Sequence, residues 1–190
     1  MPQSDKDKFR QEAVARRDAL PAEMRKAAAD TIAAWGFPLP VSGLTVSGFM
    51  PLKSEINPLP LMQKLAEEGA RLALPVVAGR GQPLIMRQWK WGEPLDSGVW
   101  GIREPKPDAL QVDPDILLVP LLAFDRTGHR IGYGAGYYDM TIAGLRAKKP
   151  VTAIGIAFAA QEIAAVPATP RDARLDLVLT EKEVIDLRVV

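Results

Sequence analysis

The sequence predicts an α/β fold: one domain, with a mainly parallel open sheet flanked by helices in Rossmann-like layers and a helical pair at its N-terminus. Short apolar runs alternate with segments of helical character along the chain. Two of these runs, residues 44–50 and 71–75, enclose a helical segment in a unit of about 30 residues, which implies parallel pairing and a right-handed crossover. No linker or repeat interrupts the 190 residues, so we expect a single domain over residues 1–190.

The composition excludes several classes of protein. A net charge of +1 argues against duplex DNA or an anionic membrane as partner. The absence of cysteine excludes disulfides, a thiolate nucleophile and cysteine-ligated metal, and the single histidine, His129, excludes a multi-histidine metal site. The first residues are charged and no apolar run approaches bilayer length, so we expect a cytoplasmic monomer that acts on small molecules.

The first two elements are predicted to be helices. Ser4 is placed to cap a helix over residues 5–19, and Pro21 opens a second that ends near Trp35. On the first helix, Lys6, Arg10 and Arg17 fall on one stripe. The ordinary interpretation of such a stripe is a solvated face; the functional one is a set of cations aimed at phosphates or carboxylates.

The middle of the chain supplies most of the sheet. After the strand at residues 44–50, Asn57 is placed to cap a helix that Gly69 closes. Residues 91–115 form a long Pro- and Gly-rich stretch, in which Trp91 and Trp100 either plug the edge of the core or provide a stacking wall for a planar ligand. The last ten residues fit a helix or an edge strand. Further strands are predicted at residues 84–90, 116–119, 151–158 and 175–180.

The segment of residues 116–139 is the main candidate site. Its apolar run breaks at Pro120, a loop follows, and residues 140–147 resume a helical pattern. Three glycines at alternate positions (Gly132, Gly134 and Gly136) stand where strand gives way to helix, a place where backbone N–H groups can cradle phosphate. The spacing is neither the dinucleotide fingerprint nor a Walker A loop, and a tight turn with positive φ explains the glycines equally well.

Charged residues of this loop also have two interpretations. Asp139 suits the first turn of a helix, or a Mg²⁺ site beside the phosphate cradle. We expect Asp125 to set the turn of the loop and His129 to face solvent. Because the loop follows a strand of a parallel sheet, the site is expected outside the carboxyl ends of the strands, together with the loops that begin at Pro51 and Pro75.

An ordered series of motifs resembles the 5-formyltetrahydrofolate cyclo-ligase family, also called methenyltetrahydrofolate synthetase. The most specific block runs from Pro120 through residues 123–125 and Arg130 to the three glycines and Tyr137-Tyr138-Asp139. The flanking pieces, which lie in the same order as in the family, are Lys6 and Arg10, Glu55-Ile56, residues 101–105, Phe158 with Gln161, and Asp172 with Asp176. The resemblance covers nearly the whole chain.

The resemblance implies an ATP- and Mg²⁺-dependent closure of 5-formyltetrahydrofolate to 5,10-methenyltetrahydrofolate, with ATP and a reduced folate as ligands. It assigns catalysis to Arg130, Tyr138 and Asp139, metal binding to Asp139 and Asp172, and substrate binding to Met50, Glu55, Trp100 and Tyr138. The residues it assigns to the nucleotide are Lys6, Arg10, Arg130, Gly132, Tyr133, Gly134, Ala135, Gly136, Tyr137 and Asp139.

One departure keeps other functions open. Many members of the family carry basic residues where this chain has Tyr133 and Ala135. The loop alone therefore offers less positive charge, which Arg130, Lys6 and Arg10 would have to supply. The alternatives are a folate- or nucleotide-binding relative without turnover, and an ATP-dependent enzyme for another small substrate.

Overall fold

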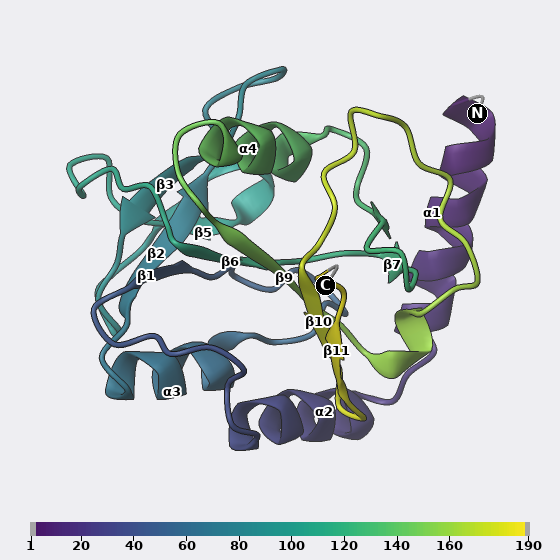
Figure 1. Cartoon of the computed structure of the whole chain (residues 1–190), viewed down its shortest axis with the longest axis horizontal. Helices are drawn as coiled ribbons and strands as arrows, with labels where there is room; N and C mark the ends of the chain where they lie inside the picture. Colours follow the sequence, from purple (N-terminus) through teal and green to yellow (C-terminus); the bar gives the residue numbers. More distant parts are fainter. Residues whose placement is uncertain (1–2, 189–190) are drawn as a thin grey trace.

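The computed structural model describes residues 3–188 (Figure 1). It contains one seven-stranded sheet and two short hairpins. The helices of the described chain are α1 (Gln3–Asp18), α2 (Ala22–Ala34), α3 (Leu59–Glu67) and α4 (Tyr137–Arg146), with 3-10 turns η1 (Val99–Gly101) and η2 (Ala159–Gln161). The sheet consists of β1 (Thr45–Ser47), β2 (Arg71–Val76), β3 (Ile85–Gln88), β6 (Ile116–Val119), β9 (Thr152–Ile156), β10 (Leu177–Leu179) and β11 (Val184–Asp186).

The strand order is β11-β10-β9-β6-β1-β2-β3. The five inner strands are parallel, and the two edge strands, β3 and β11, pair antiparallel with their neighbours. This confirms the mainly parallel α/β fold and the parallel pairing of β1 with β2. Within the described part of the last ten residues, Val184–Asp186 form the edge strand β11, so of the two alternatives for this segment the strand is correct.

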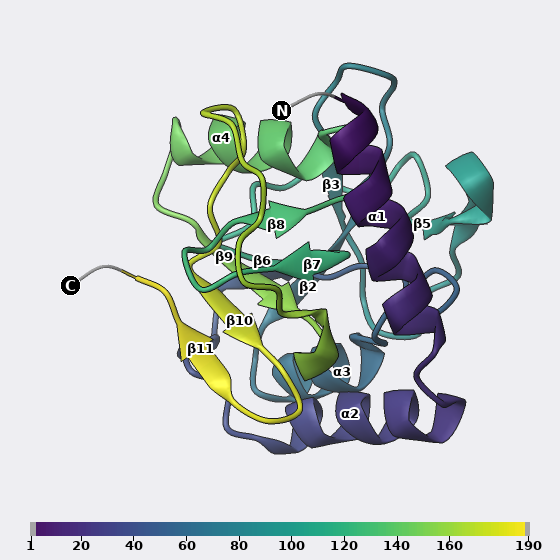
Figure 2. The ribbon, with the colours of Figure 1, turned by 90° about the vertical axis from the view of Figure 1, so that its right-hand side faces the viewer.

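The helices cover both faces of the sheet, with α2 and α3 on one side and α4 on the other (Figures 1 and 2). In β6, Ile116 and Leu118 pack into the cluster of α2 and α3, whereas Leu117 and Val119 pack into the cluster of α4. A strand covered on both faces needs apolar residues at every position, which explains the unbroken run ILLV.

The N-terminal helix α1 has a different place. It stands beside the hairpin of β7 (Ala123–Phe124) and β8 (Arg130–Ile131), at the carboxyl end of β6 (Figure 2). Ala13 packs there against Leu122, Ala123 and Ile131. The side chain of Ser4, which we expected to cap this helix, lies outside the described part of the structure.

Two segments expected to be irregular contain short hairpins. The loop after Pro120 pairs β7 (Ala123–Phe124) with β8 (Arg130–Ile131), and residues 91–115 contain β4 (Asp96–Ser97) and β5 (Arg103–Glu104). These strands are two residues long and leave no period-two pattern in the sequence. The expectation of a loop throughout was therefore wrong at both places. Helix α4 also begins at Tyr137, three residues before the predicted start at Met140.

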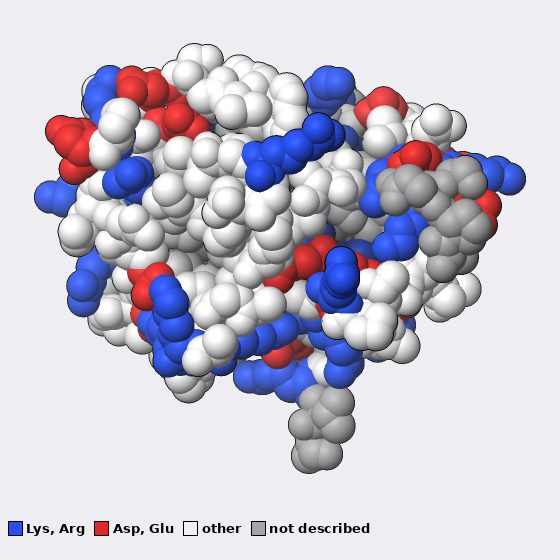
Figure 3. Space-filling view, turned by 90° about the horizontal axis from the view of Figure 1, so that it is seen from above, with Lys and Arg blue, Asp and Glu red and all other residues white. Residues whose placement is uncertain are grey.

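The surface carries both signs of charge. Lys and Arg atoms are interspersed with Asp and Glu atoms on the face shown in Figure 3. No helix within residues 3–188 is long and apolar enough to cross a bilayer.

Candidate active site

A cavity of about 1300 Å³ lies between α1, the glycine-rich loop and the loops that follow β1 and β2. Every site residue suggested by the sequence lines it: Lys6, Arg10, Met50, Glu55, Trp100, Arg130, Gly132, Tyr133, Gly134, Ala135, Gly136, Tyr137, Tyr138, Asp139 and Asp172. Residues far apart in the chain thus surround one space. Their individual binding roles stay predictions.

The glycine-rich loop needs its glycines for conformation and for space. Gly134 has φ of +109° and Gly136 has φ of +72°, a region that residues with a Cβ rarely adopt. A Cβ on Gly132 would lie 2.7 Å from Nη1 of Arg130, and one on Gly134 would lie 3.3 Å from Cζ of Arg10. The tight-turn interpretation is therefore correct. It does not exclude a phosphate cradle, because the same glycines let the guanidinium groups of Arg130 and Arg10 approach the loop.

The basic stripe of α1 faces the cavity. Arg10 Nε donates to the carbonyl oxygen of Gly132 at 3.0 Å, and Arg10 Nη1 donates to Asp7 at 2.6 Å. Lys6 Nζ lies 3.7 Å from Asp172. Arg17 is only 3% exposed. A solvated face, the ordinary interpretation of such a stripe, is therefore wrong for these three residues.

Arg17 joins α1 to two other walls of the cavity. Its Nε donates to Ser54 Oγ at 2.9 Å, and its Nη1 donates to the Tyr133 hydroxyl at 2.8 Å. That hydroxyl donates in turn to Glu55 Oε2 at 2.8 Å. Burial raises the pKa of Glu55 above its ordinary value, although the Leu52 N–H, the Tyr133 hydroxyl and the charge of Arg17 all lower it.

The buried side chain of Arg130 lies against the first residues of α4. Arg130 is buried, its Nη2 donates to Asp139 Oδ1 at 3.3 Å, and its Cζ lies 5.8 Å from the centre of the Tyr138 ring. Arg130 Nε and the Tyr138 hydroxyl are both buried without a hydrogen-bond partner in the described chain. Since buried polar groups are rarely left unpaired, these two atoms indicate where a ligand would bind. Burial also raises the pKa of Tyr138, which keeps its hydroxyl a neutral donor.

Asp139 and Asp172 would by themselves be only two ligands of the predicted metal site. No group of three or more His, Asp or Glu side chains within residues 3–188 is placed to hold an ion. Asp139 Oδ1 accepts from Arg130 and from the Ala173 N–H at 3.1 Å, whereas Asp172 Oδ2 accepts from the Thr169 N–H at 2.9 Å. Each carboxylate retains a second oxygen. Such a pair suits Mg²⁺, which often binds through one or two carboxylates and completes its shell with water and phosphate.

Two charged residues of the loop lie outside the site. Asp125 accepts hydrogen bonds from Thr127, His129 and Val166, which confirms its role in the turn. Burial raises the pKa of Asp125, but these hydrogen bonds outweigh it and hold the pKa below its ordinary value. His129 is half-buried and contacts Thr127, so the expectation of a solvent-facing histidine was only partly correct.

The two tryptophans of residues 91–115 differ. Trp100 is 68% exposed and lines the cavity, so it does not plug the core. Its φ of +57° is unusual for a residue with a large side chain. Trp91 is also exposed, and its ring lies 5.5 Å from that of the buried Trp89, away from the cavity.

Some residues that line the cavity were not predicted from the sequence as site residues. Arg17 was visible on the helical stripe, but its contacts with Ser54 and Tyr133 required the fold. Arg80, on an exposed loop, had no motif around it, and Arg103, in β5, occupies the variable position of the motif at residues 101–105. The described lining contains seven cationic and five acidic side chains, the cations being Lys6, Arg10, Arg17, Lys53, Arg80, Arg103 and Arg130. The cavity thus carries the positive excess that the loop itself lacks.

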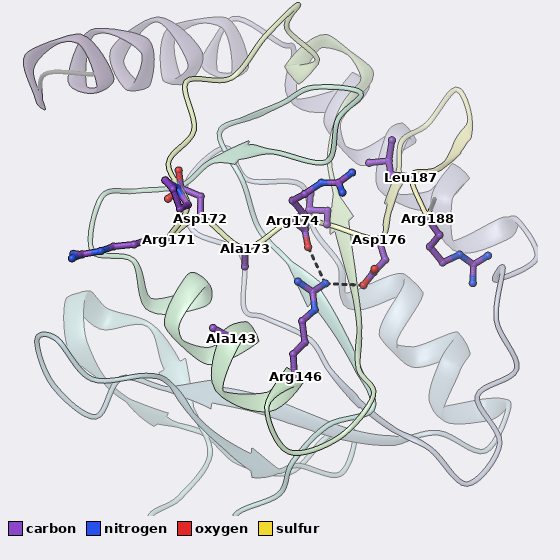
Figure 4. Close-up of a pocket in the computed structure, with 11 residues that line it drawn as sticks. Ala143, Arg146, Arg171, Asp172, Ala173, Arg174, Asp176, Leu187 and Arg188 are labelled. Carbon is purple, nitrogen blue, oxygen red and sulfur yellow. Dashed lines mark hydrogen bonds and ion pairs between the residues drawn. The ribbon is translucent and has the colours of Figure 1, made fainter. Parts of the chain in front are cut away.

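A smaller cavity of about 460 Å³ lies between α4 and residues 170–176 (Figure 4). Arg146 Nη2 donates there to the Arg174 carbonyl at 2.9 Å and to Asp176 at 3.0 Å. Arg188 pairs with Asp186 at 2.7 Å. Among the described residues, only Asp172 lines both cavities. The ion pairs of Arg146 and Arg188 give the smaller cavity a structural role.

The chain matches known proteins along its length. A model of the 5-formyltetrahydrofolate cyclo-ligase family matches residues 2–181. Proteins named 5-formyltetrahydrofolate cyclo-ligase from Mycolicibacterium smegmatis and Escherichia coli are 35% and 32% identical. The first alignment covers 93% of this chain and 94% of the relative, and the second covers 78% and 84%.

Solved structures share the fold. The Aquifex aeolicus 5,10-methenyltetrahydrofolate synthetase superimposes with a TM-score of 0.79 at 28% identity, over 97% of this chain and 94% of that one. A 5,10-methenyltetrahydrofolate synthetase from Mycoplasma pneumoniae gives a TM-score of 0.71 at 23% identity, over 93% and 99%, and supports the fold alone.

Proposed function

Because this chain belongs to the 5-formyltetrahydrofolate cyclo-ligase family, we propose that it closes 5-formyltetrahydrofolate to 5,10-methenyltetrahydrofolate and converts ATP to ADP and phosphate. It is an enzyme, a ligase that forms a carbon–nitrogen bond, which follows from its membership of the cyclo-ligase family. The observation that carries the detailed proposal is the single cavity that joins the glycine-rich loop to Glu55. Its volume of about 1300 Å³ exceeds that of a typical one-ligand pocket, roughly 300–1000 Å³, which suits two substrates.

In the proposed reaction the substrate supplies its own nucleophiles. The formyl oxygen attacks the γ-phosphorus of ATP, so that one P–O bond forms and the bond to ADP breaks. N10 then attacks the formyl carbon, forms the C–N bond and loses its proton, and phosphate leaves with the former formyl oxygen. The protein's task is to position the reactants and neutralise charge, as is usual in phosphoryl transfer.

We assign the phosphates to the loop and its cations. The N–H groups of residues 132–136 and the start of α4 favour anions. Lys6, Arg10 and Arg130 surround that loop, and the unpaired Nε of Arg130 offers a donor that a phosphate oxygen would satisfy. These contacts supply the charge that Tyr133 and Ala135 do not.

Asp139 and Asp172 fit Mg²⁺ because each has a carboxylate oxygen left over beside the proposed phosphates. When bound, Mg²⁺ would neutralise triphosphate charge. The Arg130 contact holds Asp139 in place, and the Thr169 N–H holds Asp172.

The folate is assigned to the other part of the cavity. Met50 offers apolar surface, Glu55 offers a carboxylate for pterin or amine hydrogens, and Trp100 offers an exposed aromatic face. The unpaired hydroxyl of Tyr138 lies between the two ends and is a donor for the formyl oxygen or the transferred phosphate.

The test mixes purified protein, Mg-ATP and 5-formyltetrahydrofolate and follows the near-ultraviolet absorbance of the methenyl product. Multiple turnovers that stop on chelation of the metal and resume when Mg²⁺ is restored support the proposal. Tight folate binding without turnover would show a binding protein. ATP consumption stimulated by another metabolite, and not by formylfolate, would show an enzyme with a different substrate.

We also propose that the enzyme works as a monomer in the cytoplasm. The assigned residues of one chain line a single cavity, so the proposed reaction needs no residue from a second copy. Sedimentation of active protein at the mass of a dimer would contradict the proposal of a monomer.

A further inference from the structure

The hydroxyl of Tyr133 connects the two ends of the cavity. It accepts a hydrogen bond from Arg17 Nη1 at 2.8 Å and donates one to Glu55 Oε2 at 2.8 Å. Tyr133 lies between Gly132 and Gly134, in the loop proposed to hold phosphate. Glu55 lies in the loop after β1, where the folate is proposed to bind. One side chain thus joins the two proposed subsites.

The partners of this hydroxyl are held in place. Arg17 is almost fully buried and also donates to Ser54 Oγ, which itself donates to Asp18. The other oxygen of Glu55 accepts from the Leu52 N–H at 2.6 Å. Contacts that do not involve the glycine-rich loop therefore fix both Arg17 and Glu55. The Tyr133 hydroxyl can form hydrogen bonds with them only when the loop holds it in this position.

Burial contributes little to holding Tyr133. Its side chain is half-exposed, at 52%, so its polar contacts decide where it lies. Gly134, the next residue, has φ of +109° and lies against Arg10. A shift of the loop when phosphate binds would move the Tyr133 hydroxyl and so the hydrogen bond that orients Glu55.

We propose that Tyr133 is a positioning residue whose hydroxyl couples the glycine-rich loop to Glu55, so that nucleotide and reduced folate each strengthen binding of the other. This rests on the proposed function of the cavity. It gives a role to the residue that stands where many family members have a basic side chain. Because coupling between sites is reciprocal, it can be measured from either ligand.

The experiment measures, by calorimetry, the Kd of a Mg-bound non-hydrolysable ATP analogue with and without saturating 5-formyltetrahydrofolate. We expect wild type to bind the analogue at least about fivefold more tightly when folate is present, the lower end of usual coupling. Tyr133→Phe should bring this ratio to within about twofold of one, since the ring stays and only the hydroxyl is lost. Glu55→Gln combined with Tyr133→Phe should change the ratio no further than Tyr133→Phe alone.

The control is Ser42→Ala, which removes an exposed hydroxyl from a residue that does not line the cavity. Its coupling should stay at the wild-type value. A Tyr133→Phe enzyme that keeps the wild-type ratio, or a wild type without coupling, would overturn the proposal. The outcome is separable from that of the proposed function, which is judged by wild-type turnover alone.

Discussion

Arg130 and Asp139 meet at the start of α4, where Arg130 Nη2 donates to Asp139 Oδ1 at 3.3 Å. The arginine side chain is 5% exposed and the aspartate side chain is 24% exposed. The buried cation is thus held by a carboxylate that also reaches the cavity. Asp139 therefore has a structural contact with Arg130 and a second oxygen available to a ligand. Different substitutions of Asp139 can thus separate an effect on activity from an effect on stability.

Asp139→Asn keeps an oxygen for the Arg130 and Ala173 donors but loses the charge proposed to bind Mg²⁺. We expect kcat to fall by about a hundredfold, as for loss of an electrostatic stabiliser. The melting temperature should fall less than in Asp139→Ala, because Asn keeps the hydrogen bonds to Arg130 and Ala173 although it loses the charge that balances Arg130. The control is Asp139→Ala, which leaves Arg130 unpaired and should cost about 3 kcal/mol of unfolding free energy. A fully active Asp139→Asn enzyme would limit Asp139 to its structural contact.

Gly134→Ala should weaken nucleotide binding about tenfold, which corresponds to about 1.4 kcal/mol. Its φ of +109° disfavours a Cβ, and the added atom would meet Arg10, so the loop must move. Titration with an ATP analogue measures the change. Gly144→Ala is the matched control, because Gly144 lies within α4 with open space around it and should gain up to about 1 kcal/mol of stability. Unchanged affinity in Gly134→Ala would contradict the phosphate cradle.

Lys6→Gln should raise the KM for ATP about tenfold with little change in kcat, since one charge-assisted contact contributes about 1.5 kcal/mol. Lys6 lines the cavity beside Asp172. Lys8→Gln is the control, because Lys8 is exposed on the same helix and does not line the cavity. Its KM should stay within about twofold of wild type. Equal effects of the two substitutions would mean that net charge, and not position, matters.

The pH dependence should report on Glu55. Burial raises its pKa, so kcat/KM is expected to fall as pH decreases through a value above that of an ordinary glutamate. The charged or titratable groups that act on it are Arg17, Tyr133 and Tyr138. Tyr133→Phe removes a donor to the carboxylate, so the pKa rises further and the acid limb moves to higher pH. Glu55→Gln should abolish the limb; its persistence there would assign it to another group.

The fold was predictable because its signals are local. The run ILLV of β6, the turn at Gly69 and the strand–helix–strand unit at residues 45–76 each depend on neighbouring residues. The short hairpins were not predictable, because strands of two residues carry no periodic pattern and are held by their partners. The early start of α4 was missed because glycines precede it and its first two residues are tyrosines, a pattern that favours a loop when taken alone.

The sequence by itself determined which residues could form the site, because the motifs from Lys6 to Asp172 lie in the same order as in the family. Only the tertiary structure decided how they work together. It turned the stripe of α1 toward the cavity and placed Tyr133 between Arg17 and Glu55. The reason is physical: helical spacing fixes which side chains share a face, but only packing against the carboxyl ends of the strands fixes what that face meets.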